Sequence, residues 1–235
     1  MILAGGRGTR LRPFTTTIPK PLVPIGDDGA IIEIVLRQLV QQGFDRVTLA
    51  IGHQGDIIRA YVGSGDRWGL TVEFVTEEEP LGTMGPVVQI RDRLPAHFLV
   101  LNGDILTDLP FRNLLDQHVA AEAPLTIATY RREVQVDYGV LEERGGRVIG
   151  FKEKPTLHYA VSMGAYAVAR ETLAGYPLGR PLGFDQLVLD LIAAGRSPAA
   201  YPYDGYWLDI GRPEDYDRAN LEFASARSRL LPPAM

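Results

Sequence analysis

The chain has no cysteine and only four histidines among its 235 residues. The absence of cysteine excludes disulfides, zinc sites built on thiolates and catalysis by a cysteine nucleophile. The histidines show no spacing typical of metal ligands, so we expect structural or exposed positions for His53, His97, His118 and His158. A cytoplasmic enzyme fits this composition best.

Long apolar runs are also missing, since no stretch approaches the roughly 18 uninterrupted apolar residues of a membrane span. The apolar start of the chain is too short for the core of a signal peptide, because arginines follow at once. We therefore expect no membrane partner. The composition is 46% hydrophobic and 23% charged, which indicates a folded globular chain and excludes extensive disorder.

Acidic residues are absent from the first 26 positions, although the whole chain carries a net charge of -5. The four cations of this segment are Arg7, Arg10, Arg12 and Lys20, so its charge is +4. The remainder of the chain therefore carries -9 (-5 minus +4). One concentrated basic segment indicates a local anion pocket, whereas a nucleic-acid surface would need a wider basic face. We expect no nucleic-acid partner. A solvated basic loop is the plainer alternative, but interleaved glycines favour the pocket.

Strand and helix patterns alternate up to residue 130. Short apolar runs predict strands at Met1–Ala4, Val47–Ile51, Thr71–Val75, Phe98–Leu101 and Leu125–Thr129. Apolar residues recurring every three or four positions predict helices at Ile31–Gln42, Ile57–Val62, Val87–Asp92 and Phe111–Ala121. This alternation predicts a three-layer α/β fold with a mainly parallel sheet, whose ligands bind beyond the carboxyl ends of the strands.

The pattern becomes richer in strands after residue 130. Further strands are predicted at Tyr138–Glu142, Val148–Phe151, Tyr159–Val168 and Ala199–Tyr203, and helices at Gly183–Ala194 and Pro213–Arg229. No linker rich in proline or serine separates the halves. We therefore expect one domain with a β-rich extension that covers the binding edge of the sheet.

A glycine-rich loop, "LAGGRGTRLRP" at residues 3–13, follows the first predicted strand. It does not match a dinucleotide fingerprint, because Leu11 takes the place of the third glycine, and it lacks the lysine of a P-loop. A strand followed by a glycine turn can still hold phosphate with backbone N–H groups. Arg10 and Lys20 would then neutralise a polyphosphate.

Two aspartates are candidates for a divalent metal site. Asp104 follows the apolar run "FLVLNG", just past a buried strand, and Asp209 lies 105 residues later in "WLDIG". Two carboxylates that leave room for water and substrate phosphates are the usual Mg²⁺ arrangement in nucleotide chemistry. From position alone, Asp104 could equally cap a turn and Asp209 could bond to the backbone.

Seven ordered motifs are similar to those of the sugar-1-phosphate nucleotidyltransferases, the NDP-sugar pyrophosphorylases. They are the glycine loop, "PKPLVPIG" at 19–26, "EEEPLGTMGP" at 77–86, "LVLNGDIL" at 99–106, "YGVLE" at 138–142, "FKEKP" at 151–155 and "GYWLDIGRPEDY" at 205–216. The motifs most resemble those of mannose-1-phosphate guanylyltransferases. The resemblance implies one Rossmann-like nucleotidyltransferase domain, with a nucleotide-binding half over 1–130 and a sugar-phosphate half over 131–235. Some relatives are extended by a β-helix domain; we expect none in this chain, so any homo-oligomer would form through the catalytic domain.

The same resemblance assigns roles to individual residues. The catalytic residues would be Arg10, Lys20, Asp104 and Asp209, the last two as Mg²⁺ ligands. The nucleotide would contact Leu3, Ala4, Gly5, Gly6, Gly8, Thr9, Arg10, Thr83, Gly85, Asn102 and Gly103. The sugar phosphate would contact Gly139, Glu153, Lys154 and Ser162, although Gly139 could be only a turn residue and Glu153 and Lys154 a surface ion pair. We expect Trp207 to pack in the core beside Asp209.

The implied reaction joins a nucleoside triphosphate and a sugar 1-phosphate to give an NDP-sugar and pyrophosphate. Gly85 stands where thymidylyl- and uridylyltransferases carry a base-reading glutamine, which favours GTP, with mannose 1-phosphate or a manno-heptose 1-phosphate as partner. A thymidylyl- or uridylyltransferase of the same family is the first alternative. A regulatory subunit that binds NDP-sugar without catalysis is the second, and the complete set of four charged residues argues against it.

Overall fold

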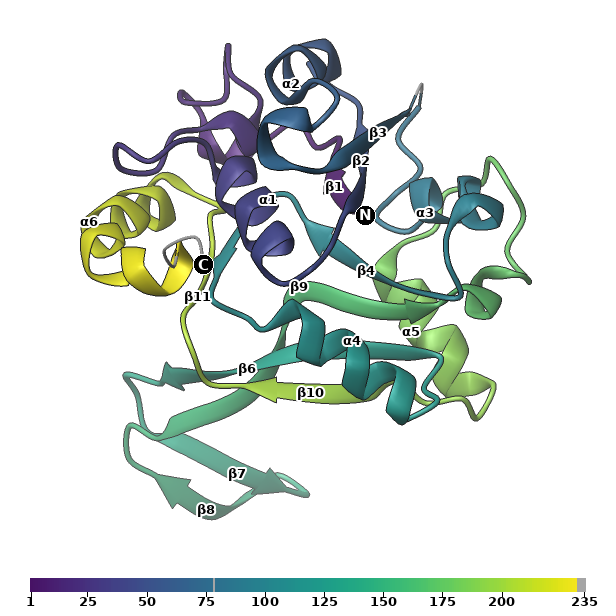
Figure 1. Ribbon diagram of the computed structural model, residues 1–235. Helices are drawn as coiled ribbons and strands as arrows, with labels where there is room; N and C mark the ends of the chain where they lie inside the picture. The colour runs from purple at the N-terminus through teal and green to yellow at the C-terminus, as the bar shows by residue number, and fades with distance from the viewer. Residues whose placement is uncertain (78, 232–235) are drawn as a thin grey trace.

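A seven-stranded mixed sheet forms the centre of the computed structural model, which describes residues 1–77 and 79–231 (Figure 1). Its strands follow the order β10-β6-β9-β4-β1-β2-β3. Their bounds are β1 (Ile2–Ala4), β2 (Arg46–Ile51), β3 (Thr71–Thr76), β4 (His97–Asn102), β6 (Leu125–Gln135), β9 (Thr156–Ala169) and β10 (Ala199–Tyr203). Only β9 runs antiparallel to its neighbours β4 and β6, so the mainly parallel sheet is confirmed.

Helices cover both faces of this sheet. One core contains α1 (Ile31–Gln41), α2 (Gly55–Val62) and α4 (Phe111–Ala120), and the other contains α3 (Gly85–Gln89) and α5 (Phe184–Ala193). Along β4, Leu99 and Leu101 face the first core, whereas Phe98 and Val100 face the second. This alternation buries both faces of a strand and produces the three layers that the sequence predicts.

A third apolar cluster attaches the end of the chain to its beginning. Helix α6 (Pro213–Leu230) packs Phe223 and Ala226 with Leu11 of the glycine-rich segment. The cluster also includes residues of two three-residue strands, β5 (Ile105–Thr107) and β11 (Trp207–Asp209), which pair antiparallel. These strands are too short for a periodic pattern, so the sequence did not predict them.

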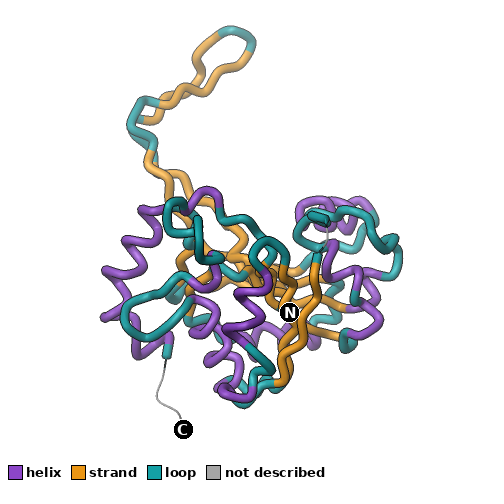
Figure 2. The backbone as a smooth tube through the Cα atoms, turned by 90° about the horizontal axis from the view of Figure 1, so that it is seen from above, coloured by secondary structure: helices purple, strands orange, loops and turns teal. Residues whose placement is uncertain are grey.

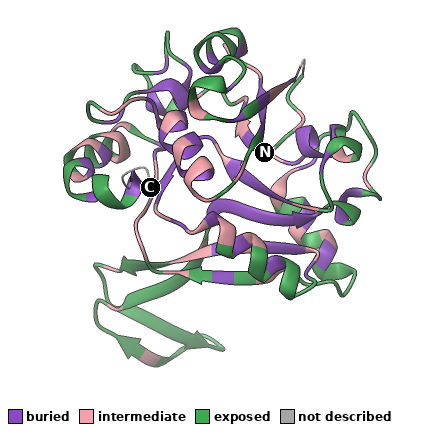
Figure 3. Cartoon of the chain, in the orientation of Figure 1, coloured by how far each residue is buried: buried purple, intermediate pink, exposed green. Residues whose placement is uncertain are grey.

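A two-stranded hairpin, β7 (Val140–Arg144) and β8 (Arg147–Lys152), projects from the body of the molecule (Figure 2). Every residue of β7 is exposed, and the hairpin is almost wholly exposed in Figure 3. The hairpin does not cover the sheet edge as expected. The reason lies in β6 and β9, which stay paired as far as Gln135 and Thr156 and carry the hairpin outward.

Several elements are longer or shorter than their sequence patterns. The predicted strand Leu125–Thr129 continues through charged, exposed residues to Gln135, where apolar alternation no longer marks a strand. The predicted helix Val87–Asp92 stops at Gln89 and gives way to a 3-10 turn at Arg91–Arg93. Other 3-10 turns are Thr9–Leu11, Lys20–Leu22, Asp66–Trp68 and Arg170–Leu173. Across the described residues, no helix has the length and apolar character needed to cross a membrane.

His118 on α4 is fully buried and is expected to make stability depend on pH. Its imidazole contacts His97 at 3.1 Å and the Thr126 hydroxyl at 2.9 Å. Burial, assisted by His97, lowers the pKa of His118 to about 4. The unfolded chain therefore takes up a proton first as pH falls below about 6.5, and the folded state loses up to about 1.4 kcal/mol per pH unit until pH 4.

Urea denaturation between pH 7 and pH 5 measures this effect. The variant His118→Gln should lose part of the pH dependence, whereas His158→Gln, at an exposed position, should keep it. An unchanged slope in the first variant would assign the pH dependence to other groups.

Candidate active site

A pocket of about 570 Å³ lies at the carboxyl ends of β1, β3 and β4. This is the edge of the sheet at which the sequence predicts ligand binding. Most residues expected to contact a nucleotide line it, together with Lys20 and Asp104: Leu3, Ala4, Gly5, Gly6, Gly8, Thr9, Arg10, Thr83, Asn102 and Gly103.

The glycine-rich loop crosses the pocket directly after β1. Gly8 has a φ of +59°, and a Cβ there would lie 3.2 Å from Lys20 Cβ, so both backbone conformation and space require glycine. The Thr15 hydroxyl donates to the Gly8 carbonyl at 2.7 Å and fixes the turn. Within the described part of the chain, the N–H groups of Gly6, Arg7 and Gly8 donate no hydrogen bond. They remain available to an anionic ligand.

A buried ion pair lies at the far end of this loop. Lys20 is 9% exposed and its Nζ donates to Asp104 Oδ2 at 2.5 Å. Lys20 begins a 3-10 turn, Lys20–Leu22, in which Pro19 precedes the lysine and Pro21 follows it, and the two prolines restrict the backbone on both sides of the lysine. The other oxygen, Asp104 Oδ1, is buried and has no hydrogen-bond partner among the described residues. This oxygen is a free ligand position for a cation.

The pairing of β11 with β5 brings Asp209 close to Asp104. Asp209 is opposite Ile105 in the ladder, and the Ile210 N–H donates to the Asp104 carbonyl at 3.0 Å. Burial and the negative charge of Asp104 raise the pKa of Asp209, while Lys20 and Arg10 act in the opposite direction. The structure thus brings Arg10, Lys20, Asp104 and Asp209 together.

Gly211 provides the space in which these charges meet. A Cβ at this position would lie 3.5 Å from Asp209 Oδ2 and 3.8 Å from the Arg10 guanidinium carbon. Two carboxylates with a free buried oxygen and two nearby cations fit a Mg²⁺ ion that also binds phosphate. The described residues contain no cluster of three or more acidic or histidine ligands, so phosphate and water would complete the coordination.

Ser162 contacts Tyr166, a residue that is influenced by the charges of the two aspartates. The Ser162 hydroxyl donates to the Tyr166 hydroxyl at 3.2 Å. Burial raises the pKa of Tyr166, and the charges of Asp104 and Asp209 add to this effect. Gly164, with a φ of +75°, allows β9 to approach Asn102, since a Cβ would lie 2.6 Å from the Asn102 amide nitrogen. Half-buried Trp207 donates from Nε1 to the Met163 carbonyl at 2.9 Å, close to this site.

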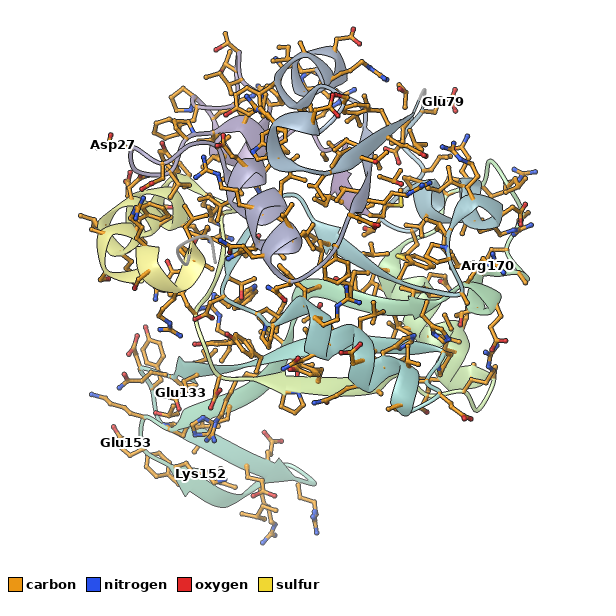
Figure 4. The ribbon with its side chains drawn as sticks, in the orientation of Figure 1. Asp27, Glu79, Glu133, Lys152, Glu153 and Arg170 are labelled. Carbon is orange, nitrogen blue, oxygen red and sulfur yellow. The ribbon has the colours of Figure 1, made fainter. Side chains whose placement is uncertain are left out.

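Five expected contacts and one expected metal ligand are not among the residues that line the pocket: Gly85, Gly139, Glu153, Lys154 and Ser162, and Asp209. Gly139, Glu153 and Lys154 lie on or next to the projecting hairpin, and Figure 4 shows Glu153 at the opposite end of the molecule from Glu79. Gly85 does not line the pocket either. A Cβ at Gly85 would come within 2.4 Å of Leu81 Cβ, so local packing requires this glycine.

The pocket also includes Glu77, for which the sequence motifs predict no role. It is the first residue after β3 and its side chain lies against Gly5. An acidic residue shortly after an apolar strand is the signal that identified Asp104, and the same signal could have identified Glu77.

A second hollow of about 600 Å³ lies at the amino ends of β1, β2 and β4. Its arginines are engaged within the protein. Arg46 and Arg93 pair with Glu73, Arg112 donates to the Gly43 carbonyl, and Arg170 donates to the Leu94 carbonyl. Because these charges are already satisfied, the pocket at the carboxyl ends is the stronger candidate.

Comparison with known proteins identifies the family of the chain. A family model described as nucleotidyl transferase matches residues 1–226. The chain is 32% identical to a mannose-1-phosphate guanyltransferase of Yarrowia lipolytica, over 100% of this chain and 66% of that protein. It is also 32% identical to a mannose-1-phosphate guanylyltransferase of Mycobacterium tuberculosis, over 94% of this chain and 63% of that protein. The chain therefore spans somewhat less than two thirds of the length of these relatives.

Solved structures agree with the fold. HddC from Yersinia pseudotuberculosis, complexed with GMP-PN, superposes with a TM-score of 0.73 at 28% identity, over 94% of this chain and 97% of that chain. A putative glucose-1-phosphate thymidylyltransferase from Bacillus anthracis superposes with a TM-score of 0.75 at 20% identity, which shows a shared fold only.

Proposed function

The chain belongs to the nucleotidyl transferase family, and we propose that it joins a nucleoside triphosphate to a sugar 1-phosphate with release of pyrophosphate. The observation that carries this proposal is the meeting of Arg10, Lys20, Asp104 and Asp209 beside an open glycine loop. A binding protein without catalytic function would not need this complete set of opposed charges.

GTP is the proposed nucleotide, and mannose 1-phosphate or a manno-configured heptose 1-phosphate is the proposed acceptor. The names of the relatives in yeast and in Mycobacterium tuberculosis support a guanylyl donor and mannose 1-phosphate. The complex of HddC with GMP-PN supports a guanine nucleotide in this pocket.

In this reaction a phosphate oxygen of the sugar 1-phosphate attacks the α-phosphorus. A new P–O bond forms there, and the bond to the β-phosphate breaks, so pyrophosphate leaves. The attacking oxygen is already anionic, and no strong base is needed. The chain therefore contributes positioning and charge. Loop N–H groups hold the phosphates, while Arg10 and Lys20 stabilise the charge that develops on pyrophosphate.

Asp104 and Asp209 would hold the Mg²⁺ ion, with the free Asp104 Oδ1 as one ligand. A bound Mg²⁺ supplies positive charge to the phosphates of both substrates. Lys20 holds the Asp104 carboxylate in one orientation through their ion pair, so that its second oxygen stays directed to the metal position.

Lys154 is proposed to contact the sugar phosphate, on the basis of the "FKEKP" motif. Lys154→Ala should lower kcat/KM for the sugar phosphate about tenfold or more, because a charge-assisted contact contributes about 1.5–3 kcal/mol. The affinity for the nucleotide should not change. Lys152→Ala is the matched control, since Lys152 lies on the same exposed segment. Equal effects of both substitutions, or weaker nucleotide binding, would contradict this role.

The direct test is a panel of nucleoside triphosphates and sugar 1-phosphates, read out as release of pyrophosphate. We expect GTP with a manno-configured sugar to give the highest rate. Turnover of dTTP or UTP above GTP would overturn the assignment of the base and keep the reaction class. Tight binding of an NDP-sugar without any turnover would instead identify a regulatory subunit.

A further inference from the structure

The turn that follows Asp209 lies in the middle of the charged part of the site. Its Ile210 side chain is fully buried in the third apolar cluster, and the Ile210 N–H donates to the Asp104 carbonyl at 3.0 Å. The next residue, Gly211, is the point near which the Asp209 carboxylate and the Arg10 guanidinium meet. A displacement of this turn would therefore move one of the two carboxylates that would hold Mg²⁺.

Asp215, at the third position of α6, fastens the far side of this turn. Asp215 Oδ2 accepts from the Arg212 N–H at 2.9 Å and from the Gly211 N–H at 3.2 Å. A capping box needs only the first of these bonds, in which the side chain at the third helical position accepts from the N-cap residue. The second bond reaches one residue further back, to the glycine of the site. Asp215 thus does more than begin a helix.

The Asp215 carboxylate is close to Asp209 but serves the turn through the backbone. A Cβ at Gly211 would lie 3.4 Å from Asp215 Oδ2 and 3.5 Å from Asp209 Oδ2. No basic side chain among the described residues forms an ion pair with Asp215. Hydrogen bonds from N–H groups to an ionised carboxylate are stronger than those to a neutral oxygen. The two bonds of Asp215 therefore hold the turn firmly.

We propose that Asp215 is a positioning residue, which fixes the turn at residues 209–212 and so keeps the Asp209 carboxylate beside Asp104. This inference rests on the proposed nucleotidyltransferase function. Asp215 does not bind the metal in this role, because its hydrogen bonds act on the chain that carries a ligand. The loss of a partner that orients a metal ligand lowers metal affinity or activity about 10- to 100-fold.

Two substitutions of Asp215 test the proposal. Asp215→Ala removes both hydrogen bonds, whereas Asp215→Asn keeps an oxygen that can accept them. The probe is Mn²⁺ alone, whose binding lowers the electron paramagnetic resonance signal of the free ion. Asp215→Ala should weaken Mn²⁺ binding about tenfold or more and lower kcat by a similar factor. Asp215→Asn should lose less of both, because its neutral oxygen still accepts the bonds but more weakly.

Two matched variants on the same helix control for stability and for surface charge. Asn220 Oδ1 accepts from the Gly26 N–H at 2.9 Å, so Asn220→Ala weakens the attachment of α6 without touching the turn. Glu214→Ala removes an exposed carboxylate next to Asp215. Both variants should keep the Mn²⁺ affinity and kcat of the original protein. Thermal unfolding of all variants shows that each is folded and compares their losses of stability.

The outcomes separate positioning from a structural or purely electrostatic role. Unchanged Mn²⁺ binding and kcat in Asp215→Ala would overturn the proposal. Equal losses in Asp215→Ala and Asp215→Asn would also overturn it, since the charge and not the hydrogen bonds would then act. Losses of Mn²⁺ binding in Asn220→Ala as large as those in Asp215→Ala would reduce Asp215 to a stabilising residue.

The measurement of Mn²⁺ binding also separates this inference from the proposed function. An original protein that binds no Mn²⁺ would overturn the role of Asp215 together with the metal site. Mn²⁺ binding that depends on the Asp215 hydrogen bonds would support the role even if the sugar 1-phosphate panel showed no turnover. That absence of turnover would count against the proposed reaction alone.

Discussion

Asp209→Asn is expected to lower kcat by about 100- to 1000-fold and to leave the fold intact, as for the loss of one preorganised electrostatic group. Asparagine has nearly the shape of aspartate, so β11 should still pair with β5. The lost negative charge is one of the two that would hold Mg²⁺ beside the phosphates. The neutral amide is a poorer ligand for this cation.

The same substitution should not destabilise the protein. The pKa of Asp209 is raised by burial and by Asp104, which means that the folded state disfavours its charged form. Removing that charge relieves repulsion within the pair, so the melting temperature should stay constant or rise. A substitution that raises stability and lowers activity is typical of a site whose charges destabilise the fold but are needed for function.

Pyrophosphate release as a function of Mg²⁺ concentration measures the first effect, and thermal unfolding measures the second. Asp204→Asn is the control, because Asp204 is exposed on the segment that leads to β11. It should retain full activity. Normal turnover of Asp209→Asn at low Mg²⁺ would show that Asp209 does not bind the metal.

The sequence predicted the parts of this site that depend on local pattern. Asp104 was identifiable because an apolar run marks β4, and a residue just past a parallel strand lies at the ligand edge. Arg10 and Lys20 were identifiable because glycines, prolines and cations share a segment without acids. Local patterning also predicted the layers of the fold, since the helices that cover the sheet show the apolar periodicity of amphipathic helices.

The parts that depend on distant pairing were not predictable in this way. Residues 105–107 and 207–209 form a ladder of only three pairs. Segments of three residues are too short for the apolar alternation that predicts a strand. The outward course of the hairpin depends on how far β6 and β9 remain paired in a polar, exposed region, where packing no longer determines the register. The position of Glu77 at the pocket was not predictable, because it depends on the contact with Gly5, which forms between segments that follow separate strands.

Lys20→Met is expected to reduce kcat by about 100- to 1000-fold and, unlike Asp209→Asn, to lower stability as well. The activity is lost because one cation no longer stabilises the leaving pyrophosphate. The stability is lost because the side chain of Asp104 is only 24% exposed and would be left without its ion-pair partner. An unpaired and partly buried carboxylate costs about 1–3 kcal/mol.

A double variant separates the two effects of Lys20. In Lys20→Met combined with Asp104→Asn, the unpaired charge is gone, so the free energy of unfolding should return towards that of the original protein. Activity should not return, because the double variant lacks both the phosphate cation and a metal ligand. Urea denaturation and pyrophosphate release on the same four proteins complete the cycle. Recovery of activity along with stability would mean that Lys20 serves only to neutralise Asp104, and its proposed role at the pyrophosphate would be wrong.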